Sequence, residues 1–505
     1  MSAVTAAAEE PLRKTPRTLD VPAFVRGRRH GLTLGALAAL AATAYAVLGL
    51  VKLSTFKASI FDLAIFDQAV RGYASFGPPT APSVGMPYGQ GMDFLQLADH
   101  FSPILAVLAP LYWIHNGPET LIVAQAVLLA LAAVPIWHYA KRRLGPVSAH
   151  LVAVAYLLSW PVAQVAGFDF HEVVFVPLLS AIMIERADAG RMRYAALAAL
   201  GILMVKEDMG LLVAGFGVYL FLTRRRLEGV GFVLFGVAAL LSIRGLLMPL
   251  VGGGGEGFHW AYGSRGATMG EVGLSIVRDP LGTLWQMVSP EVKVDTLAFL
   301  LWPMLLTALL SPLVLVAVPL VAERFLADRP QWWGPDYQYN AFVVAILVCA
   351  GVDGVHRLAG WLSGRFPDGL PGRLTARGLT GRWAFAVCVI AITLVPRFAM
   401  GQLLRASFYE GEPYVAAARE AVAKVPDGVV VEAANNVGPA LTERTTVLLW
   451  GPQSYGAPWI VADVARWTYP FGAPEVQQQR VDEALRTGYV KVFDRDGYIV
   501  LNRPS

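Results

Sequence analysis

Three short polar motifs carry the residue types from which a chemical site could be built, and each adjoins an apolar run. They are FDLAIFDQ (residues 61–68), DFHE (residues 169–172) and KED (residues 206–208). Carboxylates so close to segments apolar enough to enter a membrane are energetically costly to bury unless they face water, a metal ion or a substrate. A fourth motif, DFLQLADHFSP (residues 93–103), closes the loop that FDLAIFDQ opens. This loop is therefore the expected floor of an active site.

FDLAIFDQ has the periodicity of a short helix that carries two carboxylates. Residues four apart lie on one side of a helix, so Asp62 would share a face with Phe66 and Asp67 would lie on the next. A carboxylate held above a cavity can act as a general base toward a hydroxyl group. Asp62 and, after it, Asp67 are the candidate catalytic residues. In the alternative interpretation, Asp62 caps the helix and Asp67 pairs with Arg71.

Acidic and histidine side chains in the outer loops suggest a metal site. Oxygen ligands from Asp and Glu suit Mg²⁺ or Mn²⁺, and histidine also admits Zn²⁺. The spacing matches no closed zinc motif such as HExxH. A divalent ion, Mg²⁺ or Mn²⁺, is a candidate cofactor, and the alternative is that these groups bond to one another and to water. The candidate metal ligands are Asp99, His100, Asp169, His171 and Glu172.

The KED motif places a lysine beside two carboxylates. Lys206 could pair with Asp169 or Glu172, or it could hold a phosphate group. The simpler alternative is a hairpin tip whose charges are solvated. Aromatic residues at 332–339 could stack on a sugar, although an interfacial aromatic belt is the better interpretation. The candidate substrate- or phosphate-binding residues are Gln68, Lys206, Glu207, Asp208 and Tyr339.

The composition indicates that membrane helices hold these motifs. Of 505 residues, 55% are hydrophobic and 15% are charged, and the mean hydropathy is +0.51. In a soluble protein, roughly a quarter of the residues are charged. Because the apolar residues come in repeated long runs, the expected fold is an all-α polytopic membrane protein. Cys349 and Cys388 both lie in apolar runs and suggest neither a disulfide nor a metal motif.

Basic clusters between the apolar runs orient the chain by the positive-inside rule. Arg26, Arg28 and Arg29 precede the first run, so the N-terminus is expected in the cytoplasm. About eleven spans follow from the lengths of the apolar runs, and segment 297–322 could be one span or two. Segment 101–113 is too short to span and is expected to lie along the outer surface. This topology places the polar motifs on the outer side of the membrane, with KED either pointing outward or ending in a cavity within the membrane.

Composition also predicts the domain boundaries. Residues 1–30 would be a disordered cytoplasmic N-terminus, and residues 31–401 the transmembrane domain, with outer loops at 52–118 and 250–296. Residues 402–505 change character and predict a small extracytoplasmic α/β domain, in which an Asp-Gly turn joins a hairpin. Strands are expected at 429–431, 447–449, 489–493 and 498–501, and helices at 413–424 and 474–487.

The motifs together resemble a widespread family of predicted bacterial membrane proteins of unknown function. They are FDLAIFDQ, DHFSPILAVLAPLYWI, DFHE, KEDMGL and QYNAF, and the resemblance covers about residues 31–350. That family is similar in turn to the C-type glycosyltransferases, which include the protein O-mannosyltransferases and the aminoarabinose transferases of lipid A. Those enzymes carry a catalytic acidic residue in the first outer loop and a second acidic residue after the third span.

The resemblance implies a bacterial plasma-membrane enzyme that transfers a sugar, with inversion, from a polyprenyl-phosphate donor to an extracytoplasmic glycan, lipid or protein. Asp62 or Asp67 would occupy the first acidic position and Asp169 the second. The chain departs from the usual acidic pair, because Leu63 follows Asp62. Two other functions stay open. Charges at a broken helix also suit an ion-coupled transporter or lipid flippase, and the chain could be a non-catalytic membrane scaffold.

Overall fold

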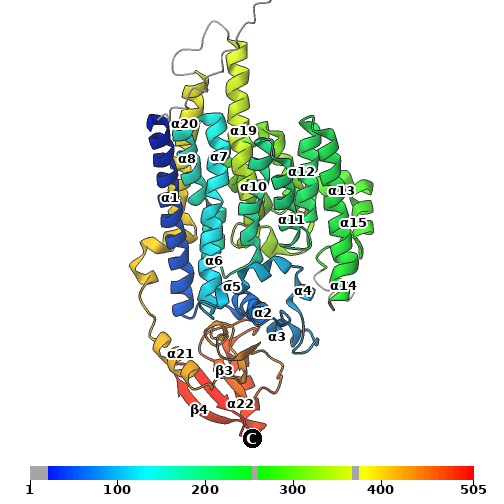
Figure 1. Cartoon of the computed structure of the whole chain (residues 1–505). Helices are drawn as coiled ribbons and strands as arrows, with labels where there is room; N and C mark the ends of the chain where they lie inside the picture. Colours follow the sequence, from blue (N-terminus) through cyan, green and yellow to red (C-terminus); the bar gives the residue numbers. More distant parts are fainter. Residues whose placement is uncertain (1–20, 253–259, 367–374, 505) are drawn as a thin grey trace, which may run out of the picture.

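The computed structural model describes residues 21–252, 260–366 and 375–504. Figure 1 shows a bundle of long helices and, against one end of it, a smaller domain that contains the sheet. The helices of the bundle are α1 (Val21–Ser54), α2 (Ile65–Ala74), α3 (Pro82–Gly85), α4 (Gln96–Asp99), α5 (Ala109–Tyr112), α6 (Pro118–Leu131), α7 (Ala133–Leu144), α8 (Pro146–Leu157), α9 (Trp160–Gly167), α10 (Phe175–Asp188), α11 (Met192–Leu203), α12 (Gly210–Leu222), α13 (Arg226–Ser242), α14 (Met248–Leu250), α15 (Met269–Arg278), α16 (Pro280–Val288), α17 (Glu291–Leu301), α18 (Val318–Leu326), α19 (Ala341–Arg365) and α20 (Ala376–Leu394).

Short turns of other helix types interrupt or join these helices. Two of them are π-helical, η1 (Ile60–Ala64) before α2 and η4 (Ile243–Leu247) after α13. A π-turn contains one residue more than an α-turn requires and often occurs at a functional site. The 3-10 turns that bear on the site or the bundle are η2 (Pro103–Leu108), η3 (Glu172–Val174), η5 (Trp302–Met304), η6 (Thr307–Leu310), η7 (Pro312–Val316), η8 (Pro330–Trp332), η9 (Gln338–Asn340) and η11 (Ala399–Leu404).

Five helices in the described ranges are long and apolar enough to cross a membrane, and the bent pair α8 and α9 would make a sixth. The predicted eleven spans are not confirmed, because several apolar runs form shorter helices, such as α11 with 12 residues and α12 with 13. Segment 297–322 forms neither one nor two continuous spans. Its prolines at 303, 312 and 319 lack an amide hydrogen and break the α-helical ladder into 3-10 turns.

Local sequence explains where the helices of the bundle start and stop. The α7 helix ends with three basic residues, Lys141, Arg142 and Arg143, which favour the negative end of the helix dipole. Gly145 then adopts a φ of 84°, which a side chain would disfavour, and Pro146 opens α8. The reversal of direction between α7 and α8 therefore follows from a Gly-Pro pair.

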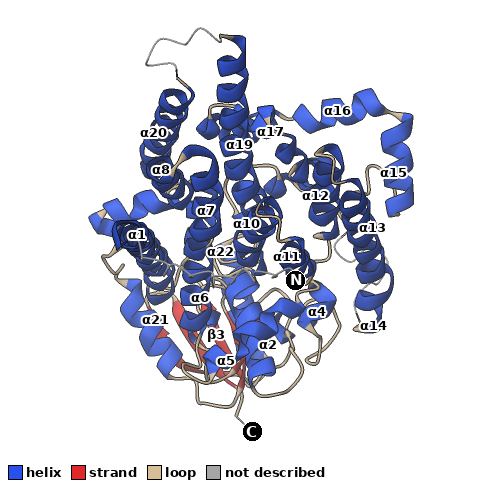
Figure 2. Ribbon diagram, turned by 45° about the horizontal axis from the view of Figure 1, so that its top comes forward, coloured by secondary structure: helices blue, strands red, loops and turns tan. Residues whose placement is uncertain are grey.

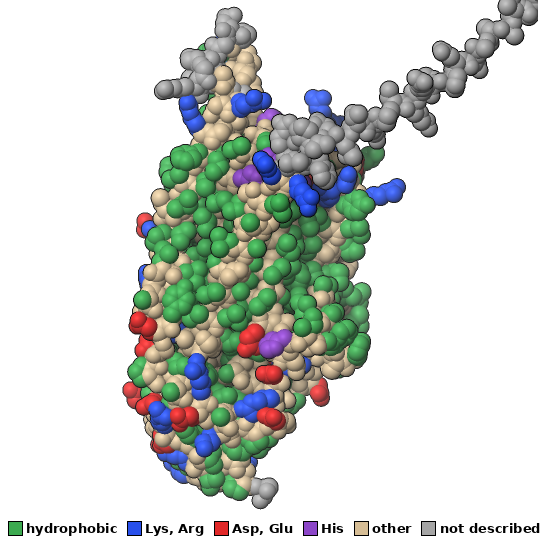
Figure 3. Space-filling model, turned by 60° about the vertical axis from the view of Figure 1, so that its left-hand side comes forward, with side chains coloured by type: hydrophobic (Ala, Val, Ile, Leu, Met, Phe, Trp, Pro, Cys, Tyr) green, Lys and Arg blue, Asp and Glu red, His purple; other side chains and the backbone are tan. Residues whose placement is uncertain are grey.

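The surface of the bundle is that of a multi-pass membrane protein. Figure 3 shows a face on which hydrophobic side chains form a broad band between two polar ends. Lys and Arg gather at one end, whereas the end with the C-terminal domain carries acidic and basic side chains together. Outward-facing residues of the spans are strongly exposed, for example Leu40 at 70% and Leu234 at 65%. Such a band fits the hydrocarbon core of a bilayer.

The C-terminal domain is a mixed sheet with the strand order β2-β1-β3-β5-β4. The first three strands are parallel, and β5 runs antiparallel to both β3 and β4. The predicted hairpin is confirmed, and its turn residues Asp496 and Gly497 both have positive φ, as a tight hairpin turn requires. The sequence did not predict β3. The elements are α21 (Tyr414–Ala423), β1 (Val430–Ala433), η13 (Gly438–Ala440), β2 (Thr446–Leu449), β3 (Trp459–Asp463), α22 (Pro474–Arg486), β4 (Val490–Arg495) and β5 (Tyr498–Asn502).

Several predicted boundaries shift. Residues 1–20 of the expected disordered N-terminus lie outside the described residues, and residues 21–30 are helical because α1 begins at Val21. The expected outer loop 250–296 contains the helices α15 and α16, which stand at the periphery of the bundle (Figure 2). Segment 101–113 forms the short η2 and α5 rather than one helix. Residues 253–259 and 367–374 of the expected loops lie outside the described residues.

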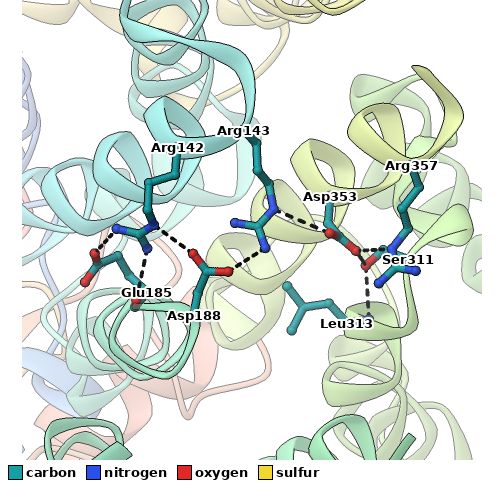
Figure 4. A network of polar contacts seen from close by, with 8 residues as sticks. All are labelled: Arg142, Arg143, Glu185, Asp188, Ser311, Leu313, Asp353 and Arg357. Atoms are coloured by element: carbon teal, nitrogen blue, oxygen red, sulfur yellow. Dashed lines mark hydrogen bonds and ion pairs between the residues drawn. The ribbon is translucent and has the colours of Figure 1, made fainter. Parts of the chain in front are cut away.

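A network of arginines and carboxylates closes the end of the bundle that is remote from the C-terminal domain (Figures 1 and 4). We call it the arginine network, and its members are Arg142, Arg143, Glu185, Asp188, Ser311, Asp353 and Arg357. Asp188 accepts from both Arg142, at 2.8 Å, and Arg143, at 2.6 Å. Asp353 pairs with Arg143 at 3.4 Å and accepts from the Ser311 hydroxyl at 2.6 Å. The network thus joins α7, α10 and α19 to the start of η7.

Candidate active site

A cavity of about 550 Å³ lies where the helical bundle meets the C-terminal domain. Its walls combine residues of the first loop, DFHE, KED, η4, α18, the 329–339 segment and the C-terminal domain. The polar motifs that the predicted topology placed on one side thus meet in one hollow. The predicted residues that line it are Asp62, Asp99, His100, His171, Lys206, Glu207, Asp208 and Tyr339.

Both π-helical turns deliver a charged side chain to this cavity. Asp62 lies in η1, directly before α2, and Arg244 lies in η4, directly after α13. Asp62 belongs to the FDLAIFDQ motif and is the first-ranked catalytic candidate, whereas Arg244 lies outside the predicted motifs. An arginine inside an apolar run was a usable signal, because an ionised residue in such a position is a functional candidate by default.

A chain of alternating acidic and basic groups runs inward from Asp62. The Asp62 Oδ1 atom lies 4.0 Å from Nε2 of His171, and the side chain of Asp62 is 19% exposed. Nδ1 of His171 lies 2.6 Å from Oε2 of Glu172, and Oε1 of Glu172 lies 3.4 Å from Nζ of Lys206. Glu172 is fully buried, so it supports His171 and Lys206 from behind and lies outside the cavity lining.

The pKa values of the two carboxyls in this chain move in opposite directions. Burial raises the pKa of Asp62 to about 6, and the neighbouring acids Asp169 and Glu172 add to the rise against His171 and Lys52. Burial also opposes ionisation of Glu172, but His171 and Lys206 outweigh it and lower the pKa to about 2. Environments that separate two carboxyls in this way are typical of acid–base sites. Asp62 can exchange a proton near neutral pH, whereas Glu172 stays ionised.

Lys206 and Arg244 give the inner part of the cavity its positive charge. Burial alone would lower the pKa of Lys206, but the nearby carboxylates Glu172, Glu207 and Asp208 raise it above its usual value. Arg244 lies within electrostatic reach of Glu207, Asp208 and Glu323. Both cations therefore persist at physiological pH, and both line the same hollow as Asp62.

Two acceptor atoms in the wall of the cavity have no hydrogen-bond partner in the described part of the chain. They are Oδ1 of Asp208 and Oε1 of Gln338, on residues that are 8% and 3% exposed. Burial, followed by the nearby Glu323, raises the pKa of Asp208 to about 7. Buried polar atoms are nearly always hydrogen-bonded in folded proteins. These two atoms are thus ready to accept from donors of a ligand or from water.

Histidine and aromatic residues complete the cavity wall. Nδ1 of His100 lies 3.1 Å from Oε1 of Glu207, so the first loop is joined to the KED turn. The Tyr339 ring packs against Trp332 and Tyr337, with centroids 5.8 Å and 6.2 Å apart. All three rings line the cavity, so these aromatic residues form part of its wall rather than only a membrane belt.

Asp67 and Gln68 point away from the cavity lining. Asp67 is fully buried, pairs with Arg71 at 2.7 Å and accepts from the Tyr112 hydroxyl at 2.7 Å. This is the pairing that the alternative interpretation of FDLAIFDQ anticipated. The amide of Gln68 makes two hydrogen bonds with the backbone of Val447 in β2, at 3.2 Å and 3.0 Å. Gln68 therefore fastens the C-terminal domain to α2, and Asp62 alone of the FDLAIFDQ acids faces the cavity.

Three of the proposed metal ligands, Asp169, His171 and Glu172, are engaged with one another or with cations. Asp169 pairs with Lys52 at 2.9 Å and accepts from the Ser59 amide at 2.9 Å. Within the described ranges, no three His, Cys, Asp or Glu side chains converge in a way that could hold a metal ion. The arrangement of Asp169, His171 and Glu172 thus does not form a ligand set, and a divalent ion stays a prediction on which no step below depends.

Several residues of the cavity carried no signal that the sequence analysis used. They come from segments far apart in the chain, and only folding brings them to the first loop. Two belong to the C-terminal domain, which therefore forms part of the cavity wall. The residues in question are Tyr88, Arg244, Tyr262, Glu323, Arg329, Asn435 and Tyr469.

Comparison with solved structures finds the same fold in ArnT from Cupriavidus metallidurans. The structure in the apo state has a TM-score of 0.53 at 15% identity, and the alignment covers 93% of this chain and 97% of that one. The structure bound to undecaprenyl phosphate has a TM-score of 0.51 at 14% identity, with 93% and 98% covered. The archaeal oligosaccharyltransferase AglB from Archaeoglobus fulgidus gives 0.42 at 12% identity, with 94% and 74% covered.

These comparisons settle fold and family. The likeness to ArnT extends over nearly the whole of both chains and shows the fold of the C-type glycosyltransferases. No curated protein matches the sequence. The profile described as "Predicted membrane protein (DUF2079)" matches residues 52–500, which include the cavity residues and the C-terminal domain. The chain therefore belongs to the DUF2079 family of predicted membrane proteins.

Proposed function

We propose that this protein is a membrane glycosyltransferase that moves a sugar from a polyprenyl-phosphate donor to an acceptor outside the cytoplasm. One observation carries the proposal: the carboxyl of Asp62 lines the same cavity as two cations, Lys206 and Arg244. An acceptor hydroxyl needs a carboxylate that can take its proton, and a leaving phosphate needs cations that stabilise its negative charge. The fold shared with ArnT supports the proposal, because one ArnT structure holds undecaprenyl phosphate.

In the proposed reaction, ionised Asp62 takes the proton of the acceptor hydroxyl as its oxygen attacks the anomeric carbon of the donor sugar. The bond between that carbon and the phosphate oxygen breaks, and the electron pair leaves with the polyprenyl phosphate. Lys206 and Arg244 stabilise the negative charge that develops on the phosphate. Attack from the side opposite the phosphate would invert the anomeric centre. His171, held by Glu172, orients and electrostatically supports Asp62.

The remaining lining residues would hold the sugar and the acceptor. Oδ1 of Asp208 and Oε1 of Gln338 can accept from sugar hydroxyls, and the Tyr339 and Trp332 rings offer faces on which a sugar can stack. The acceptor would be a glycan, a lipid or a protein. The prenyl chain would extend from the cavity into the bilayer, so we expect lateral entry of the donor.

The proposed orientation puts the cavity and the C-terminal domain outside the cytoplasm of a bacterial plasma membrane. The Lys and Arg side chains gathered at the opposite end of the bundle support it, because cytoplasmic ends of membrane helices are enriched in basic residues. Those basic residues include Lys141, Arg142 and Arg143 at the end of α7.

Asp62→Asn tests the proposal. A general base typically contributes about 10²- to 10⁴-fold to a rate, so we expect transfer to fall by that factor. The readout is mass spectrometry of lipids from membranes that contain the protein, as the ratio of glycosylated to free undecaprenyl phosphate over time. Asp93→Asn is the matched control, since Asp93 is an exposed acid of the same loop and lies outside the cavity lining. Full transfer by Asp62→Asn would contradict the proposal.

A further inference from the structure

The start of the π-turn that carries Asp62 is held by backbone and side-chain atoms from elsewhere in the chain. The first amides of a helical turn have no acceptor within the turn and need outside partners. Ser59, at the N-cap position, makes no side-chain capping bond to this turn within the described part of the chain. Its own amide donates to Asp169, at 2.9 Å. The next two amides are left for another partner.

Asn435 of the C-terminal domain supplies both missing acceptors. Its backbone oxygen accepts from the Ile60 amide at 2.9 Å, and its side-chain Oδ1 accepts from the Phe61 amide at 3.2 Å. A single residue, 374 positions along the chain from Phe61, therefore caps the turn directly before Asp62. Few capping arrangements join segments so remote, because caps are normally supplied by the residue that precedes the helix.

The packing around this cap leaves little room for adjustment. Gly438, three residues after Asn435, lies so close to Ile60 that a β-carbon there would overlap the Ile60 side chain. On the other side of η1, the paired hydrogen bonds between Gln68 and Val447 fix α2 against β2. Arg71 adds a bond to the Glu443 carbonyl at 3.3 Å. The turn is thus clamped between two anchors that both belong to the C-terminal domain.

The position of Asn435 in its own domain suits this task. It follows β1, the central strand of the parallel group β2-β1-β3, and so lies at the carboxyl ends of these strands. Functional residues in parallel sheets concentrate at that edge, where loops leave the strands. Asn435 also lines the cavity, as does Tyr469, whose ring packs against Phe61 at 5.1 Å. The edge of the sheet is therefore aimed at the Asp62 turn.

We propose that Asn435 is a positioning residue for Asp62, so that the C-terminal domain completes the site by capping the catalytic turn. This inference rests on the proposed function, in which Asp62 is the base. It gives the C-terminal domain a part in catalysis: displacement of Asn435 would free the turn and move the Asp62 carboxylate relative to Lys206 and Arg244. Docking of the domain and the competence of the base would then be coupled.

Hydrogen exchange on the full chain in detergent tests the cap without any need for transfer. In Asn435→Ala, loss of the Phe61 bond should speed exchange in the peptide that spans residues 59–64 by roughly fivefold. Asn436→Ala is the matched control, because the Asn436 amide bonds only to Asp463 and Tyr498 among the described residues. We expect this control to leave exchange at 59–64 unchanged. Unchanged exchange in Asn435→Ala, or an equal rise in the control, would overturn the inference.

Transfer kinetics then distinguish positioning from a merely structural role. Asn435→Ala should lower kcat about tenfold and leave the affinity for undecaprenyl phosphate unchanged. Asn435→Asp restores the acceptor oxygen and should restore slow exchange, while its added negative charge near Asp62 should move the acid limb of the pH profile upward. A fixed profile with full exchange protection would contradict the link to Asp62. If the wild-type protein transfers no sugar, the proposed function fails, and the exchange result still decides whether Asn435 caps the turn.

Discussion

The protein holds two dense groups of charged side chains, one at each end of its helical bundle, and they are built on different rules. In the arginine network, each carboxylate described meets an arginine: Asp188 meets two, and Asp353 meets Arg143 and Arg357 (Figure 4). In the cavity, oxygen atoms of Asp208 and Gln338 lack partners among the described residues, and Asp62 is 4.0 Å from its histidine. The first group is saturated, and the second is open.

This difference distinguishes a charged cluster that stabilises the fold from a charged cluster that binds a substrate. Pairing within the arginine network uses up its hydrogen-bonding capacity and joins three helices, so removal of a member should be felt in stability. The cavity holds its charges around a hollow of about 550 Å³, and removal of a member should be felt in binding or in rate. Buried ionisable residues cluster at both kinds of place, so the unmet oxygen atoms are the better guide.

The largest effect on stability should come from Asp353→Ala. Asp353 is the hub of the arginine network, and its loss leaves Arg143 and the buried Ser311 hydroxyl without this acceptor. Breaking a buried ion pair from one side costs about 3 kcal/mol. Thermal unfolding in detergent should show it as a clear fall in melting temperature. Arg357→Ala is the control, because Arg357 is 47% exposed and should cost about 1 kcal/mol or less. An equal fall in melting temperature in both variants would contradict the stabilising role given to the buried pairs of Asp353.

A cavity cation should show the opposite pattern. Arg244→Met should weaken binding of undecaprenyl phosphate by about 10- to 100-fold, as loss of a charge-assisted hydrogen bond does. The melting temperature should change little. Within the described part of the chain, Arg244 makes no ion pair comparable to those that Arg143 makes with Asp188 and Asp353. Native mass spectrometry with added undecaprenyl phosphate measures the affinity. Arg193→Met, an exposed arginine outside the cavity lining, serves as the control. Unaltered binding by Arg244→Met would argue against a phosphate site.

The smallest effect, and the most specific in sign, concerns Asp208. Because its pKa is raised to about 7, the native state binds more protons than the unfolded state between about pH 4 and pH 7, and this carboxyl destabilises the fold increasingly as pH rises through that window. Asp208→Asn should therefore gain stability over the wild type, by about 1 kcal/mol more at pH 6 than at pH 5. Paired melting curves at the two pH values give the difference. A constant difference would mean that Asp208 ionises normally.

Much of the site could be predicted from the sequence because its parts are short and adjoin apolar runs. Loop 61–100, DFHE and KED each stand where a helix ends, and the basic clusters predict that they share one side of the membrane. The hairpin of the C-terminal domain was visible because a tight turn needs positive φ, which Asp496 and Gly497 supply. The fold class followed from apolar composition together with the family resemblance.

The remaining features depend on contacts that no local pattern encodes. Asp62 and Asp67 have similar neighbours in sequence, and only the folded position of Tyr112 and Arg71 removes Asp67 from the cavity. The predicted span count is not confirmed, because prolines divide the 297–322 run and because α11 and α12 are short. The β3 strand was missed since its five residues, Trp459–Asp463, lack a clear alternation. Asn435 and Arg244 reach the site only through tertiary packing.

The extra residue in each of the two π-helical turns changes the direction in which the side chains after it point. Each residue of an α-helix turns the chain by about 100°, so the extra residue of η1 or η4 offsets everything that follows it by that angle. In η1 the offset separates the direction of Asp62 from that of the Asp67–Arg71 pair. The η1 turn therefore allows α2 to pack on the C-terminal domain while Asp62 lines the cavity. The η4 turn allows Arg244 to line the same cavity.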